Sequence, residues 1–161
     1  MNIEIICIGT LKESYLKEAE REYLKRLSPY LKVSVTELRE ARLPKAAGSA
    51  EEENVRVREG EALLAATKKY EKAYVFALDA RGQQQSSEKF ASTIFYLANN
   101  GNSNLVFIIG GSLGLSEEVR KRADMVLSFS EMTFPHQMMR VILLEQIYRS
   151  QKINRGEPYH K

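Results

Sequence analysis

The stretch Asn104–Ser116, NLVFIIGGSLGLS, decides the fold class of this chain. Five consecutive apolar residues follow Asn104, which is the pattern of a strand buried on both faces. Two glycines come directly after this strand, and Ser116-Glu117-Glu118 then begins a short helix. A buried strand that turns at once into a helix is the repeating unit of a parallel sheet.

The same alternation of strand and helix extends in both directions from this stretch. Ser49 and Glu52 have the spacing of a capping box for a long helix, and Pro135 is expected at the first position of the last helix. The pattern predicts an α/β fold, a mainly parallel sheet with helices on both faces. The predicted strands are 2–9, 31–39, 72–78, 104–109 and 125–129, and the predicted helices are 14–27, 49–69, 86–98, a short one from 116, and 135–152.

Length and composition indicate one globular domain. The chain has 161 residues, of which 43% are hydrophobic and 28% charged, and this excludes a largely disordered or repetitive protein. Its one cysteine, Cys7, cannot form an intrachain disulfide. The first ten residues do not resemble a signal peptide, and no apolar run approaches the roughly 20 residues needed to span a bilayer. We therefore expect a cytoplasmic protein with no membrane association.

The formal net charge of +3 lies entirely in the last segment of the chain. Residues 1–135 have balanced charge. A basic C-terminal segment after a neutral body indicates an anionic partner. The alternative is a basic helix end that the helix dipole favours. After residue 135 the basic residues are Arg140, Arg149, Lys152, Arg155 and Lys161, and the acidic ones are Glu145 and Glu157.

Ligands of parallel sheets bind at the carboxyl ends of the strands, and three segments qualify here: 79–85, 110–116 and 128–135. The glycines of 110–116 allow a ligand to approach the backbone, although their offsets fit neither a Walker A loop nor a dinucleotide fingerprint, and a plain tight turn is the alternative. The loop 128–135 suits an apolar ring such as adenine, unless Met132 and Phe134 merely fill the core.

The last predicted helix is apolar on nearly all sides, so it must be buried on more than one side. Either a second copy of the chain or neighbouring helices of the same chain cover it. His136 and Arg140 share one face at its start, whereas Arg149 lies about 180° around the helix from Arg140. A histidine at a helix start also serves as a cap or packing residue. The two histidines, with Cys7 far away in sequence, have no spacing of a metal site, so no metal is expected.

Several segments together resemble the methyltransferase H family, the SPOUT-class enzymes that methylate N3 of a pseudouridine in 23S ribosomal RNA. The resemblance covers the whole chain, and the MT-x-PHQ-x-x-R segment and the terminal PYHK are specific when they occur together. The segments that carry it are ALDARG (77–82), IGGSLGLS (109–116), LSFSEMTFPHQMMRVILLEQIYR (127–149) and PYHK (158–161).

The resemblance implies one SPOUT domain over residues 1–161 with a C-terminal trefoil knot, a homodimer, and S-adenosyl-L-methionine as methyl donor. The knot that holds the cofactor would lie within about 76–152, and 153–161 would be an RNA-contacting tail. Substrate and partner would be 23S rRNA within the assembled ribosome. By motif position the cofactor-binding residues would be Leu78, Gly110, Phe129, Ser130, Glu131, Met132, Thr133 and Phe134.

Methylation of N3 requires the loss of its proton, so a cation or general base near N3 would help. His160 and Arg149 are the candidates, Tyr159 would stack on or orient the base, and His136 and Arg140 would support the site. Because the two arginines diverge, we expect a site shared between two subunits. Two other functions compete with this one: a nicotinamide-dependent oxidoreductase, and a non-catalytic RNA-binding module.

Overall fold

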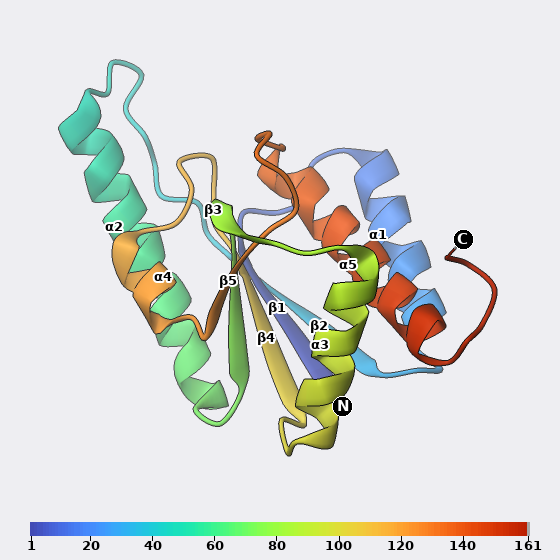
Figure 1. The fold of residues 1–161 in the computed structure, drawn as a ribbon. Coiled ribbons are helices and arrows are strands. Elements are labelled where there is room, and N and C mark those ends of the chain that lie inside the picture. The colour runs from blue at the N-terminus through green and yellow to red at the C-terminus, as the bar shows by residue number, and fades with distance from the viewer. Residues whose placement is uncertain (161) are drawn as a thin grey trace.

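The computed structural model describes residues 1–160, which form one five-stranded sheet with helices on both faces (Figure 1). The strands lie in the order β2-β1-β4-β3-β5, and all neighbours are parallel, which confirms the predicted α/β fold. The strands are β1 (Asn2–Ile8), β2 (Lys32–Leu38), β3 (Tyr74–Gln84), β4 (Asn104–Ile109) and β5 (Met125–Ser128). The helices are α1 (Ser14–Leu27), α2 (Ser49–Thr67), α3 (Ser87–Asn99), α4 (Glu117–Arg122) and α5 (His136–Asn154), and a 3₁₀ turn, η1 (Lys68–Tyr70), follows α2.

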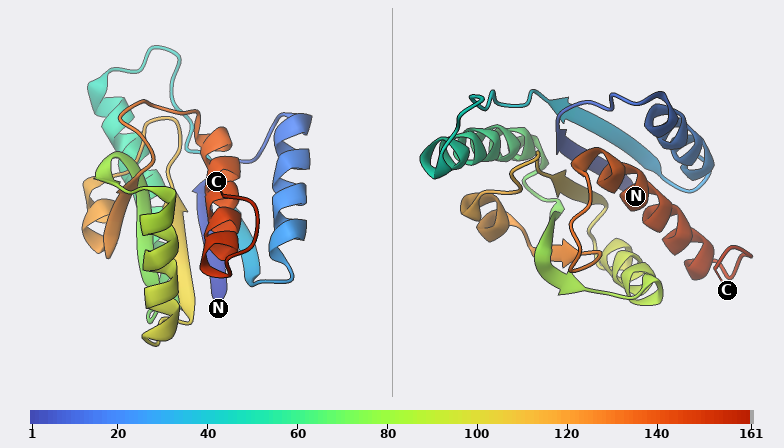
Figure 2. Two further views of the ribbon diagram at one scale, coloured as in Figure 1. Left: turned by 45° about the vertical axis from the view of Figure 1, so that its right-hand side comes forward. Right: turned by 90° about the horizontal axis from the view of Figure 1, so that it is seen from above.

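Helices α1, α3 and α5 cover one face of the sheet, and α2 and α4 cover the other (Figure 2). Successive residues of a strand point to opposite faces, and both sets are buried. In β4, for example, Phe107 belongs to the core under α3 and α5, whereas Ile108 belongs to the core under α2 and α4. This two-sided burial explains why the strands read as nearly continuous apolar runs.

The helix starts agree with the sequence to within one residue. Ser86 and Ser116 cap α3 and α4, and the hydroxyl of each accepts a backbone N–H three residues later. Two details differ from the prediction. The carboxylate of Glu51 accepts the N–H of Gly48, so the capping interaction lies one residue earlier than Ser49 and Glu52, and Pro135 lies just before the first helical residue of α5.

Strand β3 is longer than predicted, because it continues past Leu78 to Gln84. Its first part pairs with both β4 and β5, and after a register shift Gln83 and Gln84 pair with β5 again. At Gly82, β3 approaches the backbone of β5 so closely that a Cβ atom would lie 2.6 Å from the carbonyl oxygen of Val126. Glycine is therefore required at this crossing.

Helix α5 is buried by its own chain. It packs between α1 and α3 over the sheet, and Leu143, Leu144 and Ile147 are fully buried. The alternative of cover by neighbouring helices thus accounts for most of the apolar circumference. An apolar residue of this helix such as Leu144 could have faced a partner subunit, but its side chain has no exposed surface in a single chain.

Candidate active site

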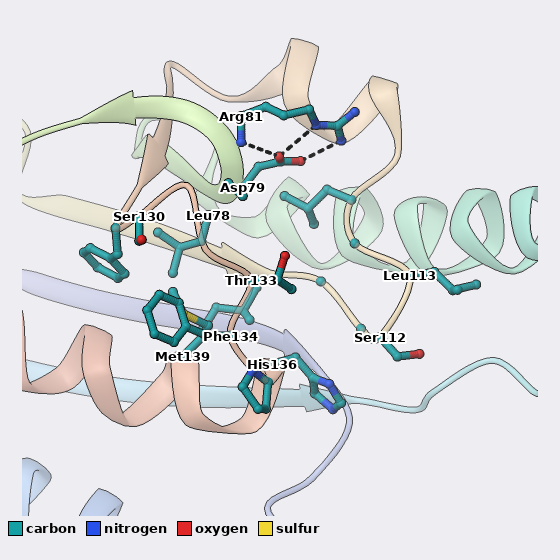
Figure 3. Close-up of a pocket in the computed structure, with 18 of the residues that line it drawn as sticks. Leu78, Asp79, Arg81, Ser112, Leu113, Ser130, Thr133, Phe134, His136 and Met139 are labelled. Carbon is teal, nitrogen blue, oxygen red and sulfur yellow. Dashed lines mark hydrogen bonds and ion pairs between the residues drawn. The ribbon is translucent and has the colours of Figure 1, made fainter.

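A cavity of about 610 Å³ lies at the carboxyl edge of the sheet, where the three predicted strand-end segments meet (Figure 3). It brings together seven of the eight residues expected to bind the cofactor. Glu131 is the exception and does not line the cavity. The lining residues are Leu78, Asp79, Ala80, Arg81, Ile109, Gly110, Gly111, Ser112, Leu113, Gly114, Leu115, Leu127, Phe129, Ser130, Met132, Thr133, Phe134, Pro135, His136 and Met139.

The glycine loop forms one wall of the cavity. A Cβ on Gly110 would lie 2.9 Å from the backbone of Gly114, so this turn has no room for a larger residue at position 110. The N–H of Gly114 donates to the carbonyl of Gly111 at 3.1 Å, and Gly114 has a φ of 78°. From α2, Arg56 Nε donates to the carbonyl of Leu113 at 3.1 Å. The loop is thus held in a shape that leaves its backbone close to the cavity.

The loop after β5 forms the opposite wall. The hydroxyl of Ser128 donates to the carbonyl of Ser130, and the hydroxyl of Ser130 accepts the N–H of Met132. Met132 is 74% exposed, so it does not fill the core, whereas Phe134 is half-buried. The loop therefore presents apolar side chains and backbone groups to the cavity, as an adenine ring requires.

Two charged side chains of β3, just after Leu78, stand at the rim. The side chain of Asp79 is only 7% exposed and pairs with Arg81 and with Arg120 of α4. Burial alone would raise the pKa of Asp79, but the hydrogen bonds from Arg81 and the two positive charges outweigh it and lower this pKa below its usual value. Asp79 is therefore an ionised anchor, and its lowered pKa makes it a weak proton acceptor.

His136 lines the cavity at the start of α5. Its Nε2 is buried without a hydrogen-bond partner among the described residues, and the nearest carboxylate is Glu40, from the loop after β2. The backbone N–H of Ala41 donates to Glu59 on α2, whose other carboxylate oxygen is buried against Gly111. Burial raises the pKa of Glu59. The 39–41 segment thus contacts two residues next to the cavity, His136 through Glu40 and Glu59 through Ala41.

Arg140 lies outside the cavity. Its side chain is buried, and its guanidinium pairs with Glu20 of α1 and Glu37 of β2 and donates to the carbonyl of Gly9. These bonds tie α5 to α1 and to the first two strands. Within the protomer Arg140 therefore lies beneath the site and does not line the cavity.

The tail residues lie at the other end of α5. Arg149 Nη1 is 3.2 Å from Nδ1 of His160, and Nε2 of His160 is 2.8 Å from Glu88. The ring of Tyr159 packs edge-on against Tyr148. None of Arg149, Tyr159 and His160 lines the cavity of its own chain. Since Arg149 is 13 residues beyond His136, it lies about 20 Å further along the helix.

Among residues 1–160, no group of three or more His, Cys, Asp and Glu side chains is placed to hold a metal ion. In the same part of the chain, no helix has the length and apolarity of a membrane span.

Sequence comparison places the chain among known methyltransferases. A family profile described as "Predicted SPOUT methyltransferase" matches residues 1–160. Proteins named "Ribosomal RNA large subunit methyltransferase H" are 56% identical in Clostridium novyi (strain NT) and 55% identical in Bacillus cytotoxicus. Both alignments run over 161 residues and cover 100% of each chain.

Solved structures share the fold at low sequence identity. A probable methylase family protein from Haemophilus influenzae Rd KW20 superposes with a TM-score of 0.58 at 13% identity, covering 99% of this chain and 70% of that one. A tRNA (m1G37) methyltransferase from Aquifex aeolicus gives 0.55 at 14% identity, covering 92% and 70%.

Sequence reasoning identified the three loops but missed two residues. Arg81 lay in a segment that was singled out, yet nothing in the sequence showed that its side chain reaches the cavity rim. Glu40 gave no signal, because its relation to His136 depends on how β2 is placed in the sheet.

Proposed function

The chain belongs to the SPOUT methyltransferase family, and from this premise we propose that it methylates N3 of a pseudouridine in 23S rRNA of the large ribosomal subunit. The observation that carries the proposal is the match over the full chain, at 50–56% identity, to proteins named for ribosomal RNA large subunit methylation. A chain of this size and modest charge would rely on the shape of the assembled ribosome for much of its recognition.

The cavity supports S-adenosyl-L-methionine as the methyl donor. Its volume of about 610 Å³ lies within the range of about 300–1,000 Å³ that is usual for small-ligand sites. The bare backbone at Gly110 and the apolar loop ending at Phe134 offer close approach on one side and a ring-sized surface on the other. When bound, this cofactor would supply an electrophilic methyl group on its sulfonium, and Leu78, Gly110 and the 129–134 loop would hold it.

The residues of this chain would mainly position the methyl donor and the acceptor base and accept the proton that leaves N3. Holding donor and acceptor in line removes much of the entropic barrier, and apolar walls such as Leu78 and Leu127 exclude water. The N3 proton has to leave during the transfer. Within one chain, His136 is the lining residue that could accept it, whereas His160 and Arg149 could do so only from outside the cavity of their own chain.

We further propose that the protein acts as a homodimer with a shared site. The support is geometric, because Tyr159 and His160 contact residues of α5 and α3 at the end of α5 that is far from the cavity. The tail residues up to His160 could therefore serve a reaction at the cavity only if they come from a second copy, and Lys161 lies outside the described residues. Exposed apolar residues available for such a contact include Phe95, Tyr96 and Met138.

A methyl-transfer assay tests the proposed function. The protein would be incubated with radiolabelled cofactor and either intact ribosomes or free 23S rRNA from cells that lack the modification, and the modified nucleotide would be mapped. We expect transfer to one pseudouridine, with ribosomes as the better substrate. Absence of transfer to both substrates would contradict the proposal.

Cofactor binding separates the competing functions. S-adenosylhomocysteine should raise the melting temperature, and NAD should not, since the glycine offsets fit no dinucleotide fingerprint. A non-catalytic RNA-binding module would respond to neither. Sedimentation at micromolar concentration tests the dimer, and a monomer at all concentrations would contradict the shared site.

A further inference from the structure

The guanidinium of Arg81 is held in one orientation by the residue two positions before it. Both the backbone N–H and Nε of Arg81 donate to Oδ1 of Asp79, and Nη2 donates to Oδ2, each at 3.0 Å. The pairing is bidentate, so it fixes the plane of the guanidinium as well as its distance (Figure 3).

The anchor of this arrangement is itself fixed. Asp79 is buried and also lies 3.4 Å from Nη1 of Arg120, whose other contact is the carbonyl of Leu115 at 2.6 Å. One residue after Arg81, Gly82 crosses the backbone of Val126 so closely that no side chain fits between them. The turn that carries Arg81 is thus restrained on both sides.

Stability does not explain why an arginine is held in this way. The side chain of Arg81 is 69% exposed, and ion pairs at such positions contribute little to the free energy of folding. Its Nη1 makes no hydrogen bond within residues 1–160, so the edge formed by Nη1 and Nη2 remains available. Arg81 is also the one permanently charged cation among the described residues that line the cavity.

We infer that Arg81 binds an anionic oxygen at the mouth of the cavity. A preorganised guanidinium edge suits the oxygens of a phosphate or a carboxylate, and loses little entropy on binding because Asp79 already orients it. Under the proposed function, on which this inference rests, two groups have this chemistry. One is a backbone phosphate of the substrate RNA, and the other is the carboxylate of the amino-acid end of the cofactor.

The test uses three variants of the full-length protein. Arg81→Ala removes the cation, and Arg81→Lys keeps the charge but loses the planar edge. Lys121→Ala is the matched control, since Lys121 is 71% exposed, is paired with Glu117 and lies outside the cavity. Calorimetry would measure the affinity for S-adenosylhomocysteine and for 5′-methylthioadenosine, which lacks the amino-acid end. Steady-state kinetics on ribosomes would be recorded over a range of salt concentrations.

The two sources of the oxygen predict different results. If the ligand is an RNA phosphate, Arg81→Ala raises KM for ribosomes about tenfold. The negative slope of log(kcat/KM) against log salt becomes shallower by about 0.7–0.9, because one phosphate contact is lost. The affinities for S-adenosylhomocysteine and 5′-methylthioadenosine stay unchanged. If the ligand is the carboxylate, the same variant weakens S-adenosylhomocysteine binding about tenfold and leaves 5′-methylthioadenosine binding unchanged. In either case Arg81→Lys should be intermediate.

The inference would be overturned if Arg81→Ala and the Lys121→Ala control agree within twofold both in the calorimetric affinities and in KM for ribosomes. The failure of the proposed function would look different. A wild-type protein that binds S-adenosylhomocysteine but modifies no ribosome refutes the RNA substrate, and the calorimetric comparison then decides on Arg81 alone. A wild-type protein that binds neither S-adenosylhomocysteine nor 5′-methylthioadenosine refutes both the proposed function and the inference about Arg81.

Discussion

Nε2 of His136, in the wall of the cavity, lies 3.5 Å from Oε1 of Glu40, in the loop after the edge strand β2. The carboxylate of Glu40 lies against the backbone of Gly9, where a Cβ atom would collide with it. Lys12 lies 3.9 Å from its other oxygen. The imidazole that faces the cavity thus has a carboxylate directly behind it.

We predict that Glu40 orients His136 for its role in methyl transfer. Glu40→Gln should lower kcat on ribosomes about tenfold, and His136→Asn about a hundredfold, which is the scale of an acid–base or positioning group. The affinity for S-adenosylhomocysteine, measured by calorimetry, should change less than threefold in Glu40→Gln. If kcat remains at the wild-type value in both variants, His136 has only a packing role.

Gly110 should be essential for cofactor binding. In Gly110→Ala the new Cβ would lie 2.9 Å from the backbone of Gly114, so the loop must shift and the affinity for S-adenosylhomocysteine should fall at least tenfold. Gly101→Ala is the control. It forces a side chain into a φ of 86° in open space, which should cost about 1–2 kcal/mol of stability without changing the affinity. Equal affinities in the two folded variants would place the binding site elsewhere.

The tail should serve the RNA and not the cofactor. Replacing Tyr159 and His160 together by alanine should leave S-adenosylhomocysteine affinity within a few-fold, because neither residue lines the cavity of its own chain. Methyl transfer to ribosomes should fall about a hundredfold or more. Circular dichroism would verify the fold, and transfer at the wild-type rate would exclude both residues from the reaction.

Arg140 should be a stability determinant. Arg140→Ala removes a buried guanidinium and leaves the partly exposed carboxylates of Glu20 and Glu37 without their partner, so urea unfolding should show a loss of about 1.5–3 kcal/mol. Lys121→Ala breaks an exposed pair with Glu117 and should cost less than about 1 kcal/mol. A loss as small for Arg140→Ala would contradict the structural role.

Cys7 should be chemically inert in the folded protein. Burial raises the pKa of its thiol to about 11, and its Sγ contacts the carbonyl of Thr36. At pH 8 a thiol reagent should therefore react only after unfolding in urea. A raised thiol pKa stabilises the fold below the unfolded value of about 8.5, and this contribution is lost as the pH rises toward 11. Cys7→Ala should lack that part of the alkaline decline, and fast labelling of the native protein would contradict the prediction.

The sequence by itself determined the order and the type of the elements. Burial of both strand faces appears directly as runs such as 104–109, and the caps at Ser86 and Ser116 are local interactions. It also located the three loops of the cavity, because all strands of a parallel sheet end at the same edge. The motifs near the C-terminus indicated the family, which the profile match confirms.

Only the tertiary structure decided which side chains meet. Arg140 and Glu37 pair across 103 residues, and this contact exists because β1 and β2 occupy one edge of the sheet under α5. The same placement puts Glu40 behind His136, and the packing of α1 and α3 removes Leu144 from any partner surface. Local patterns of hydrophobicity encode the faces of an element but not the order of strands, so contacts of this kind follow from the sheet order and not from any one segment.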